Sequence, residues 1–199
     1  MHRRAFLAAA GSLALAGCGG GSSDQKTTAT TTAGGATEGL PGEPDDAATL
    51  RYALTLEHVE ADLYRQAAAT DFFKGSEREL IRTFAQQETA HVDALTEALR
   101  KAGGRPEPAP ETKLPLSDRQ TVLATALRLE NLGAAAYLGQ LARIADRDIL
   151  ATLVSIHSVE ARHAATLSLL LGKPVTPTGA FAKPENMATV LRVADLYTA

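Results

Sequence analysis

This sequence contains almost no cysteine and no tryptophan, and it has no excess of basic residues over acidic ones. Its 199 residues include one cysteine and no tryptophan, and aromatic residues make up 5% of the chain. A single cysteine excludes an intramolecular disulfide. The 20 basic residues are outnumbered by 23 acidic ones, and no basic patch interleaved with aromatic residues is present. Nucleic-acid binders need such a patch, so we expect no nucleic-acid partner.

The amino terminus has the pattern of a signal peptide, which we place at residues 1–17. Arg3 and Arg4 precede an apolar run that ends at Ala16 and is too short to cross a bilayer as a stable helix. The order Arg3-Arg4-Ala5-Phe6-Leu7 resembles a twin-arginine export signal, although a Sec signal can also carry two arginines. The order Leu15-Ala16-Gly17-Cys18 resembles the lipobox of bacterial lipoproteins. That resemblance implies acylation of Cys18; the alternative is a free thiol behind a plain secretory signal.

Residues 18–45 are expected to form a flexible linker, and residues 46–199 a single folded domain. The linker is rich in Gly, Ser and Thr and shows no apolar periodicity, so it cannot form a core. Together with the signal, it predicts an exported protein of the cell envelope, tethered to a membrane by a lipid at Cys18.

The domain is expected to be all α-helical. It contains no sustained alternation of apolar and polar residues, whereas four segments show the 3.6-residue period of an amphipathic helix. Capping boxes are suggested by Ser76 with Glu79 and by Ser117 with Gln120. The four helices, followed by a short outer one, are expected at about Asp46–Ala69, Glu77–Ala102, Asp118–Ala145, Asp148–Leu171 and Pro184–Leu196.

Loop lengths predict how these helices are arranged. Short connections at residues 71–75 and 146–147 imply two antiparallel hairpins. A long proline-rich stretch at residues 103–116 separates the hairpins and can run back along the bundle. Two hairpins joined by one long crossover form the topology of a ferritin-like four-helix bundle.

Ionisable residues interrupt the apolar face of every main helix near its middle. A charged side chain in a bundle core is unfavourable unless it is paired or bound to a metal ion. One such residue would carry little information, but here each of the four helices has at least one. They are Glu57, Glu88, His91, Glu130, Glu160 and His163.

The spacing of these residues repeats between the two halves of the domain. Glu88-Thr89-Ala90-His91 and Glu160-Ala161-Arg162-His163 both read Glu-x-x-His, and residues at i and i+3 share a helix face, so both side chains can reach one ion. On the other two helices, Tyr64 and Tyr137 each follow a glutamate by seven residues. The domain is therefore an internal repeat of two hairpins.

The alternative to a metal site is a metal-free bundle with a buried polar network. The tyrosines Tyr64 and Tyr137 are either core aromatics or hydrogen-bond partners of ligand carboxylates. Three further residues are expected not to be ligands. His58 lies about 100° round the helix from Glu57, whereas Glu60 and His157 correspond in the repeat to Gly133 and Ala85.

From about Asp46 to Leu171 the sequence resembles the ferritin-like di-metal carboxylate proteins. Segments such as Tyr52-Ala53-Leu54-Thr55-Leu56-Glu57 are most similar to the bacterial exported ferritin-like domain family. The resemblance implies two metal ions bridged by Glu88 and Glu160. It also implies terminal carboxylates from Glu57 and Glu130, and one imidazole for each ion, from His91 and His163.

Four carboxylates, two imidazoles and no thiolate suit iron or manganese. The leading hypothesis is a di-iron or di-manganese oxidase or peroxidase that acts on dioxygen or peroxide as a small oxidant. Because no Cys-x-x-Cys unit is present, any electron donor must be a separate redox partner. The alternative is a non-catalytic metal-binding or stress-related envelope protein, so whether the protein is an enzyme stays open. Storage of iron in a cage is a weaker third hypothesis, since a lipid on each chain would be awkward on a closed shell.

Overall fold

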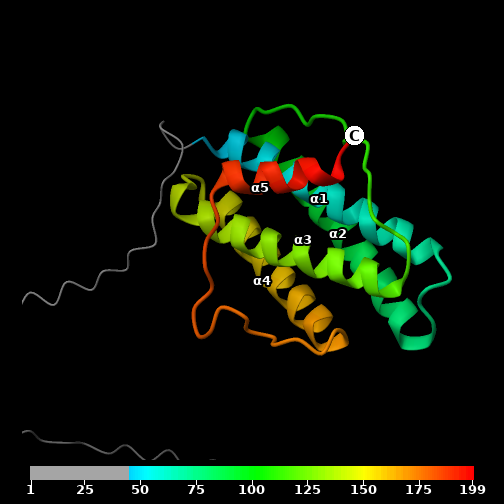
Figure 1. Cartoon of the computed structure of the whole chain (residues 1–199). Coiled ribbons are helices and arrows are strands. Elements are labelled where there is room, and N and C mark those ends of the chain that lie inside the picture. The colour runs from blue at the N-terminus through cyan, green and yellow to red at the C-terminus, as the bar shows by residue number, and fades with distance from the viewer. Residues whose placement is uncertain (1–44) are drawn as a thin grey trace, which may run out of the picture. The chain divides into compact units, whose positions relative to one another are not determined.

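The computed structural model describes residues 45–199, which form an all-helical bundle (Figure 1). The expected signal peptide, Cys18 and nearly all of the expected linker lie outside the described residues. No strand occurs within residues 45–199. The helices are α1 (Asp46–Ala69), α2 (Gly75–Lys101), α3 (Arg119–Gln140), α4 (Arg147–Leu170) and α5 (Met187–Ala194). Two short 3₁₀ turns follow α3 and α5, at Leu141–Arg143 and Asp195–Tyr197.

Aspartate side chains begin three of the four long helices. Asp45, Asp118 and Asp146 each accept hydrogen bonds from backbone amides of the first turn, and this satisfies donors that the helix cannot satisfy itself. Neither capping box expected from the sequence forms. Asp118 takes the place expected for Ser117, and α2 begins at Gly75, whose positive φ of 54° turns the chain into the helix without a side-chain cap.

Polar contacts at the helix ends show which ends lie together. At one end, Arg119 at the start of α3 donates to Glu77 at the start of α2 over 2.9 Å. At the other end, Asp46 at the start of α1 accepts from the amides of Ala145 and Asp146, just before α4. Thus α2 and α3 start together, and the crossover between them must run the length of the bundle, as Figure 1 shows.

The third helix is shorter than expected, because it ends at Gln140 rather than near Ala145. The amides of Ala145 and Asp146 donate to Asp46 at 3.0 and 2.8 Å, so they are held by α1 and not by helix carbonyls. The expected hairpins, α1 with α2 and α3 with α4, are both present, and α1 also packs on α3.

The C-terminal segment is fastened across α1, α3 and the crossover. The short helix α5 packs on α1 and α3. The amide of Lys113 in the crossover donates to the carbonyl of Tyr197 over 2.7 Å, and Ala199 donates back to Glu111 over 2.8 Å. The amide of Glu185 donates to Ala135 on α3 over 2.9 Å. These contacts bind the two irregular segments of the domain to the bundle.

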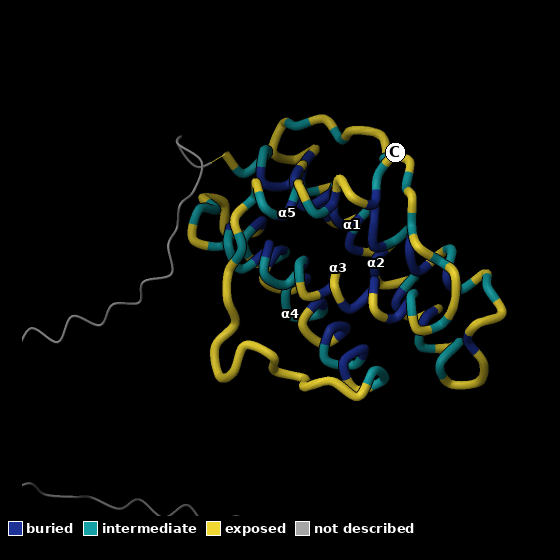
Figure 2. Tube along the Cα trace, in the orientation of Figure 1, coloured by how far each residue is buried: buried dark blue, intermediate teal, exposed yellow. Residues whose placement is uncertain are grey.

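The apolar core consists of two clusters: a smaller one at one end of the bundle, and a larger one that begins at the other end and extends along α1 and α3 to α5. One cluster joins the start of α1 to the end of α2 and includes Leu50, Leu54, Leu95 and Leu99. The other joins the start of α2 to the end of α4 and includes Ile81, Phe84, Leu123 and Leu167. Figure 2 shows the buried faces of the helices turned toward the bundle interior. None of the helices in the described part of the chain is long and apolar enough to span a membrane.

Candidate metal centre

Six ionisable side chains converge in the middle of the bundle, between the two apolar clusters. They fall into two overlapping groups of four, and within each group the candidate ligand atoms lie within 4.8 Å of one another. Both groups share Glu88 and Glu160, one from α2 and one from α4. The structure thus brings together all six residues that the sequence singled out. The groups are Glu57, Glu88, His91 and Glu160, and Glu88, Glu130, Glu160 and His163.

Each histidine turns its Nδ1 atom toward carboxylates of its own group. The Nδ1 of His163 lies 2.9 Å from Glu88 Oε1 and 3.2 Å from Glu130 Oε1. The Nδ1 of His91 lies 3.1 to 3.2 Å from one oxygen of each of three carboxylates: Glu57, Glu88 and Glu160. Nitrogen and oxygen atoms at this spacing surround two positions that cations can occupy.

The polar atoms at this site are better satisfied by a pair of bound cations than by hydrogen bonds among themselves. The four glutamates are fully buried, with 0% of their surface exposed. Yet many of their oxygens, together with His163 Nδ1, have no hydrogen-bond partner among the described residues. A buried charged oxygen without a partner costs several kcal/mol. The lone pairs left over are those that metal coordination uses, so the cluster can hold metal ions.

Without metal, the cluster shifts the pKa values of its own members. Burial, reinforced by repulsion from neighbouring carboxylates, raises the pKa of Glu57, Glu130 and Glu160 well above the usual value of 4.5. For His91, burial alone would lower the pKa, but the three carboxylates that surround its Nδ1 outweigh burial and raise the pKa to about 12. Metal-free protein therefore keeps protons at positions where bound metal would place positive charge.

Two tyrosines reach across the bundle to Glu57 and Glu130. Tyr64 on α1 donates its hydroxyl proton to Glu130 on α3, and Tyr137 on α3 donates to Glu57 on α1. Both hydroxyls are buried with their acceptors. Of the two roles left open by the sequence, the geometry is that of hydrogen-bond partners which orient carboxylates.

Glu60 is a further buried carboxylate, which from the sequence is expected not to be a ligand. Its side chain is 0% exposed, and neither oxygen has a hydrogen-bond partner among the described residues. Burial and repulsion from the cluster, chiefly from Glu160, raise its pKa well above 4.5. A Cβ atom on Gly133 would lie 2.9 Å from Glu160 Oε2 and 3.2 Å from Glu60 Oε1. The glycine that argued against a ligand at this position is thus what makes room for Glu60.

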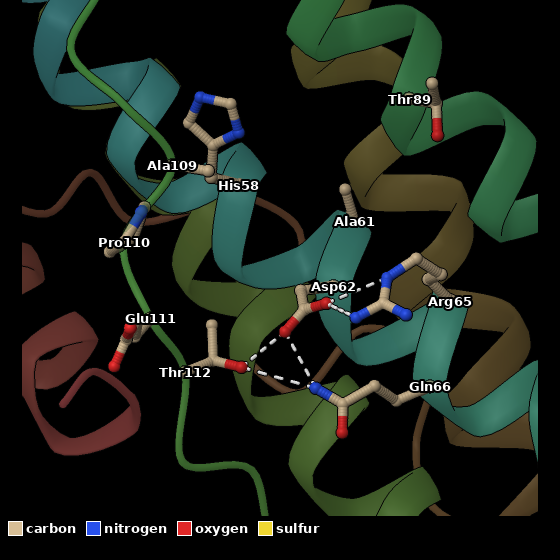
Figure 3. A pocket seen from close by; sticks show the side chains of 10 residues that line it. All are labelled: His58, Ala61, Asp62, Arg65, Gln66, Thr89, Ala109, Pro110, Glu111 and Thr112. Carbon is tan, nitrogen blue, oxygen red and sulfur yellow. Dashed lines mark hydrogen bonds and ion pairs between the residues drawn. The ribbon is translucent and has the colours of Figure 1, made fainter.

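The two remaining histidines that we considered lie outside the cluster. The Nδ1 of His157 is 2.9 Å from the backbone carbonyl of Ala134. His58 lines a pocket of about 520 Å³ between α1, Thr89 of α2 and the crossover. Figure 3 shows this pocket, in which Asp62 is bound by Arg65, Gln66 and Thr112. None of the six candidate ligands lines it.

Comparison with known proteins agrees with the ferritin-like fold. Residues 45–173 match the family model of the ferritin-like domain, and the chain belongs to that family. A crystal structure of a conserved hypothetical protein from Mycobacterium tuberculosis is similar, with 24% identity and a TM-score of 0.59, over 68% of this chain and 96% of that one. So is a structure of ferritin-like diiron-carboxylate proteins from Bacillus anthracis, with 22% identity and a TM-score of 0.56, over 63% and 94%. Among curated proteins, none gives a significant match.

Proposed function

We propose that this protein binds a pair of iron or manganese ions and uses them in redox chemistry with dioxygen or peroxide. The observation that carries the proposal is the sharing of Glu88 and Glu160 by both four-residue groups. Two carboxylates common to two sets of ligands hold two ions close together, which is the arrangement of the di-metal carboxylate proteins.

The donor set supports this choice of metal. The cluster offers carboxylate oxygens and imidazole nitrogens, and the only cysteine of the chain, Cys18, is far from it in sequence. Hard and borderline ligands of this kind favour iron and manganese over copper(I) or structural zinc. When bound, such ions supply the capacity to exchange electrons with a small oxidant.

Charge balance supports a change of oxidation state. The four carboxylates of the two groups neutralise two divalent cations, leaving no net charge in the interior. Glu60, when ionised, adds a further negative charge beside Glu160, and this favours cations of higher charge. The residues around the ligands keep their geometry fixed, since Tyr64 and Tyr137 hold the terminal carboxylates.

The test is to add Fe²⁺ to metal-free protein without oxygen and then to admit air or peroxide. We expect about two ions per chain and a change in the absorption spectrum on oxidation. The variant Glu88→Ala should lose both ions, because its carboxylate belongs to both groups. Glu97→Ala is the matched control, since that residue lies on the same helix with its side chain 68% exposed. Iron that binds but does not oxidise faster than free Fe²⁺ would contradict the proposed redox chemistry.

Metal binding without turnover is a second candidate, favoured by the depth of the cluster. All four glutamates are fully buried, and the pocket of Figure 3 is not lined by the candidate ligands. Oxidation that stops after one round, with no catalytic consumption of peroxide in the presence of a chemical reductant, would favour this role.

We also propose that the protein is exported and held at a membrane of the cell envelope by a lipid on Cys18. The lipobox-like sequence before Cys18 and the linker after it support this proposal. In cells, Cys18→Ala should move the protein from the membrane fraction to the soluble fraction. An unchanged distribution would contradict lipid anchoring. If the protein is anchored in this way, any separate redox protein must reach the domain at that membrane.

A further inference from the structure

The two histidines of the cluster have different surroundings. The Nε2 of His163 lies 2.8 Å from the side-chain oxygen of Gln87. The ring of Phe84 covers the His163 ring at a centroid distance of 3.9 Å and an angle of 31°, and Tyr64 approaches it edge-on at 6.5 Å. His163 is therefore held by a hydrogen bond and by aromatic packing, and its side chain is only 3% exposed.

His91 has none of this support on its outer side. Its Nδ1 faces the carboxylates, but no described residue forms a hydrogen bond with its Nε2. Within residues 45–199, its only ring contact is with His163, at a centroid distance of 6.4 Å. The side chain is 11% exposed, so this edge of the cluster lies closer to solvent. The ring of His91 is thus less firmly fixed than that of His163.

The sequence accounts for the difference between the two histidines. Gln87 stands directly before Glu88, and the corresponding residue before Glu160 is Val159, which has no polar side-chain atom. Likewise, Phe84 corresponds to Ile156 in the second half. The internal repeat preserves the residues that can hold metal but not the residues that fix the imidazoles.

A hydrogen bond of this kind determines which ring nitrogen of a histidine is free to bind metal. An acceptor at Nε2 keeps the proton there and leaves the Nδ1 lone pair directed at Glu88 and Glu130. It also prevents the ring from rotating, so less freedom is lost when the ion binds. Removing such a partner typically costs about 10- to 100-fold in metal affinity.

We infer that the two metal positions are unequal: the position at His163 fills first and binds more tightly, and Gln87 is the positioning residue that makes it so. The position at His91 fills second and exchanges its ion more readily. This inference rests on the proposed metal binding. It adds an order of filling, and a residue responsible for that order, which the six-ligand pattern alone does not provide.

The experiment is a calorimetric titration of full-length, metal-free protein. Mn²⁺ and Fe²⁺ are each added in the absence of oxygen. Wild-type protein should bind in two steps. The variant His91→Ala should keep the tighter step, and His163→Ala should lose it. Gln87→Val, which copies Val159, should weaken the first step by about 10- to 100-fold and leave the second unchanged.

Two controls separate positioning from structure. Gln86→Val changes the neighbouring glutamine, which is exposed as Gln87 is but makes no contact with His163, and should leave both steps unchanged. Gln87→Glu keeps an acceptor in place and should retain the tight step. In parallel, nitrogen NMR of labelled histidine should show the proton of His163 on Nε2 in wild type and a redistribution to Nδ1 in Gln87→Val.

The outcomes are distinct. Two equal steps in wild type, loss of the tighter step in His91→Ala, or a tight step that survives Gln87→Val would overturn the inference and leave the metal proposal standing. No binding of either ion to wild-type protein would overturn both.

Discussion

Tyr137 donates its hydroxyl proton to Glu57, eighty positions earlier in the chain, across the contact between α3 and α1. The reverse contact, from Tyr64 on α1 to Glu130 on α3, completes a reciprocal pair. Each half of the repeat therefore supplies a hydroxyl that orients a buried carboxylate of the other half. This exchange explains why a tyrosine follows each of these glutamates by seven residues, about two helical turns.

Replacing Tyr137 with phenylalanine removes one of these bonds while keeping the ring. We expect a loss of about 1–3 kcal/mol in the free energy of unfolding, because Glu57 loses a buried donor. We also expect metal affinity to fall by about tenfold. Urea denaturation and metal titration measure the two effects.

Tyr52→Phe is the matched control for that variant. Tyr52 is buried on α1, but its hydroxyl has no hydrogen-bond partner among the described residues. Its removal should leave metal affinity unchanged and stability unchanged or slightly higher. Equal effects of the two substitutions would show that the bond from Tyr137 to Glu57 has no special role.

Gly133→Ala should separate stability from metal binding. Alanine favours a helix over glycine by up to about 1 kcal/mol, so the metal-free protein should not lose stability through the backbone. The added methyl group, however, would lie 2.9 Å from Glu160 Oε2 and would displace a carboxylate that belongs to both four-residue groups. Metal titration should show a loss of at least about tenfold in affinity.

Gly139→Ala provides the contrast on the same helix. Its methyl group would lie 2.1 Å from the backbone carbonyl of Glu185, so the C-terminal segment must detach or shift. We expect lower thermal stability with metal affinity retained. If this variant lost metal as readily as Gly133→Ala, the effect at Gly133 would not be local to the cluster.

Glu60→Gln tests whether the additional buried carboxylate is a ligand. Glutamine has nearly the same shape but no charge, so it relieves repulsion with Glu160 and should raise the unfolding free energy of metal-free protein. On the six-ligand pattern, both ions should still bind. Loss of an ion from this variant would make Glu60 a ligand, against the expectation from sequence.

The stability of metal-free protein should fall as the pH rises above about 4.5. The raised pKa values of Glu57, Glu60, Glu130 and Glu160 mean that the folded state binds more protons than the unfolded state above that pH. His91, whose pKa rises to about 12, acts in the same direction above pH 6.5. Glu88, whose pKa falls to about 2, acts in the opposite direction only below pH 4.5.

Thermal melts from pH 5 to 9, with and without Mn²⁺, measure this dependence. Because metal replaces the bound protons, the rise in Tm caused by Mn²⁺ should grow with pH. Metal-free protein whose stability rises steadily over that range would show that the carboxylates are ionised without cost.

The sequence predicted the bundle and the convergence of its six ionisable residues because both depend on periodicity along single helices. The bounds of α1 agree with the expected range, since its start signal, Asp45, is local. The end of α3 could not be predicted, because it depends on Asp46 from another helix. The burial of Glu60 and the contact of Gln87 with His163 could not be predicted for the same reason, because they depend on Gly133 and His163 on neighbouring helices. Burial of Glu60 opposite a glycine is a signal that a helix-by-helix reading does not contain.

The most direct test of the central claim is elemental analysis of full-length protein purified from its native cells, alongside the Glu88→Ala variant. We predict about two ions of iron or manganese per wild-type chain and none in the variant. Wild-type protein that contains no transition metal, or a variant that retains as much metal as wild type, would contradict the claim.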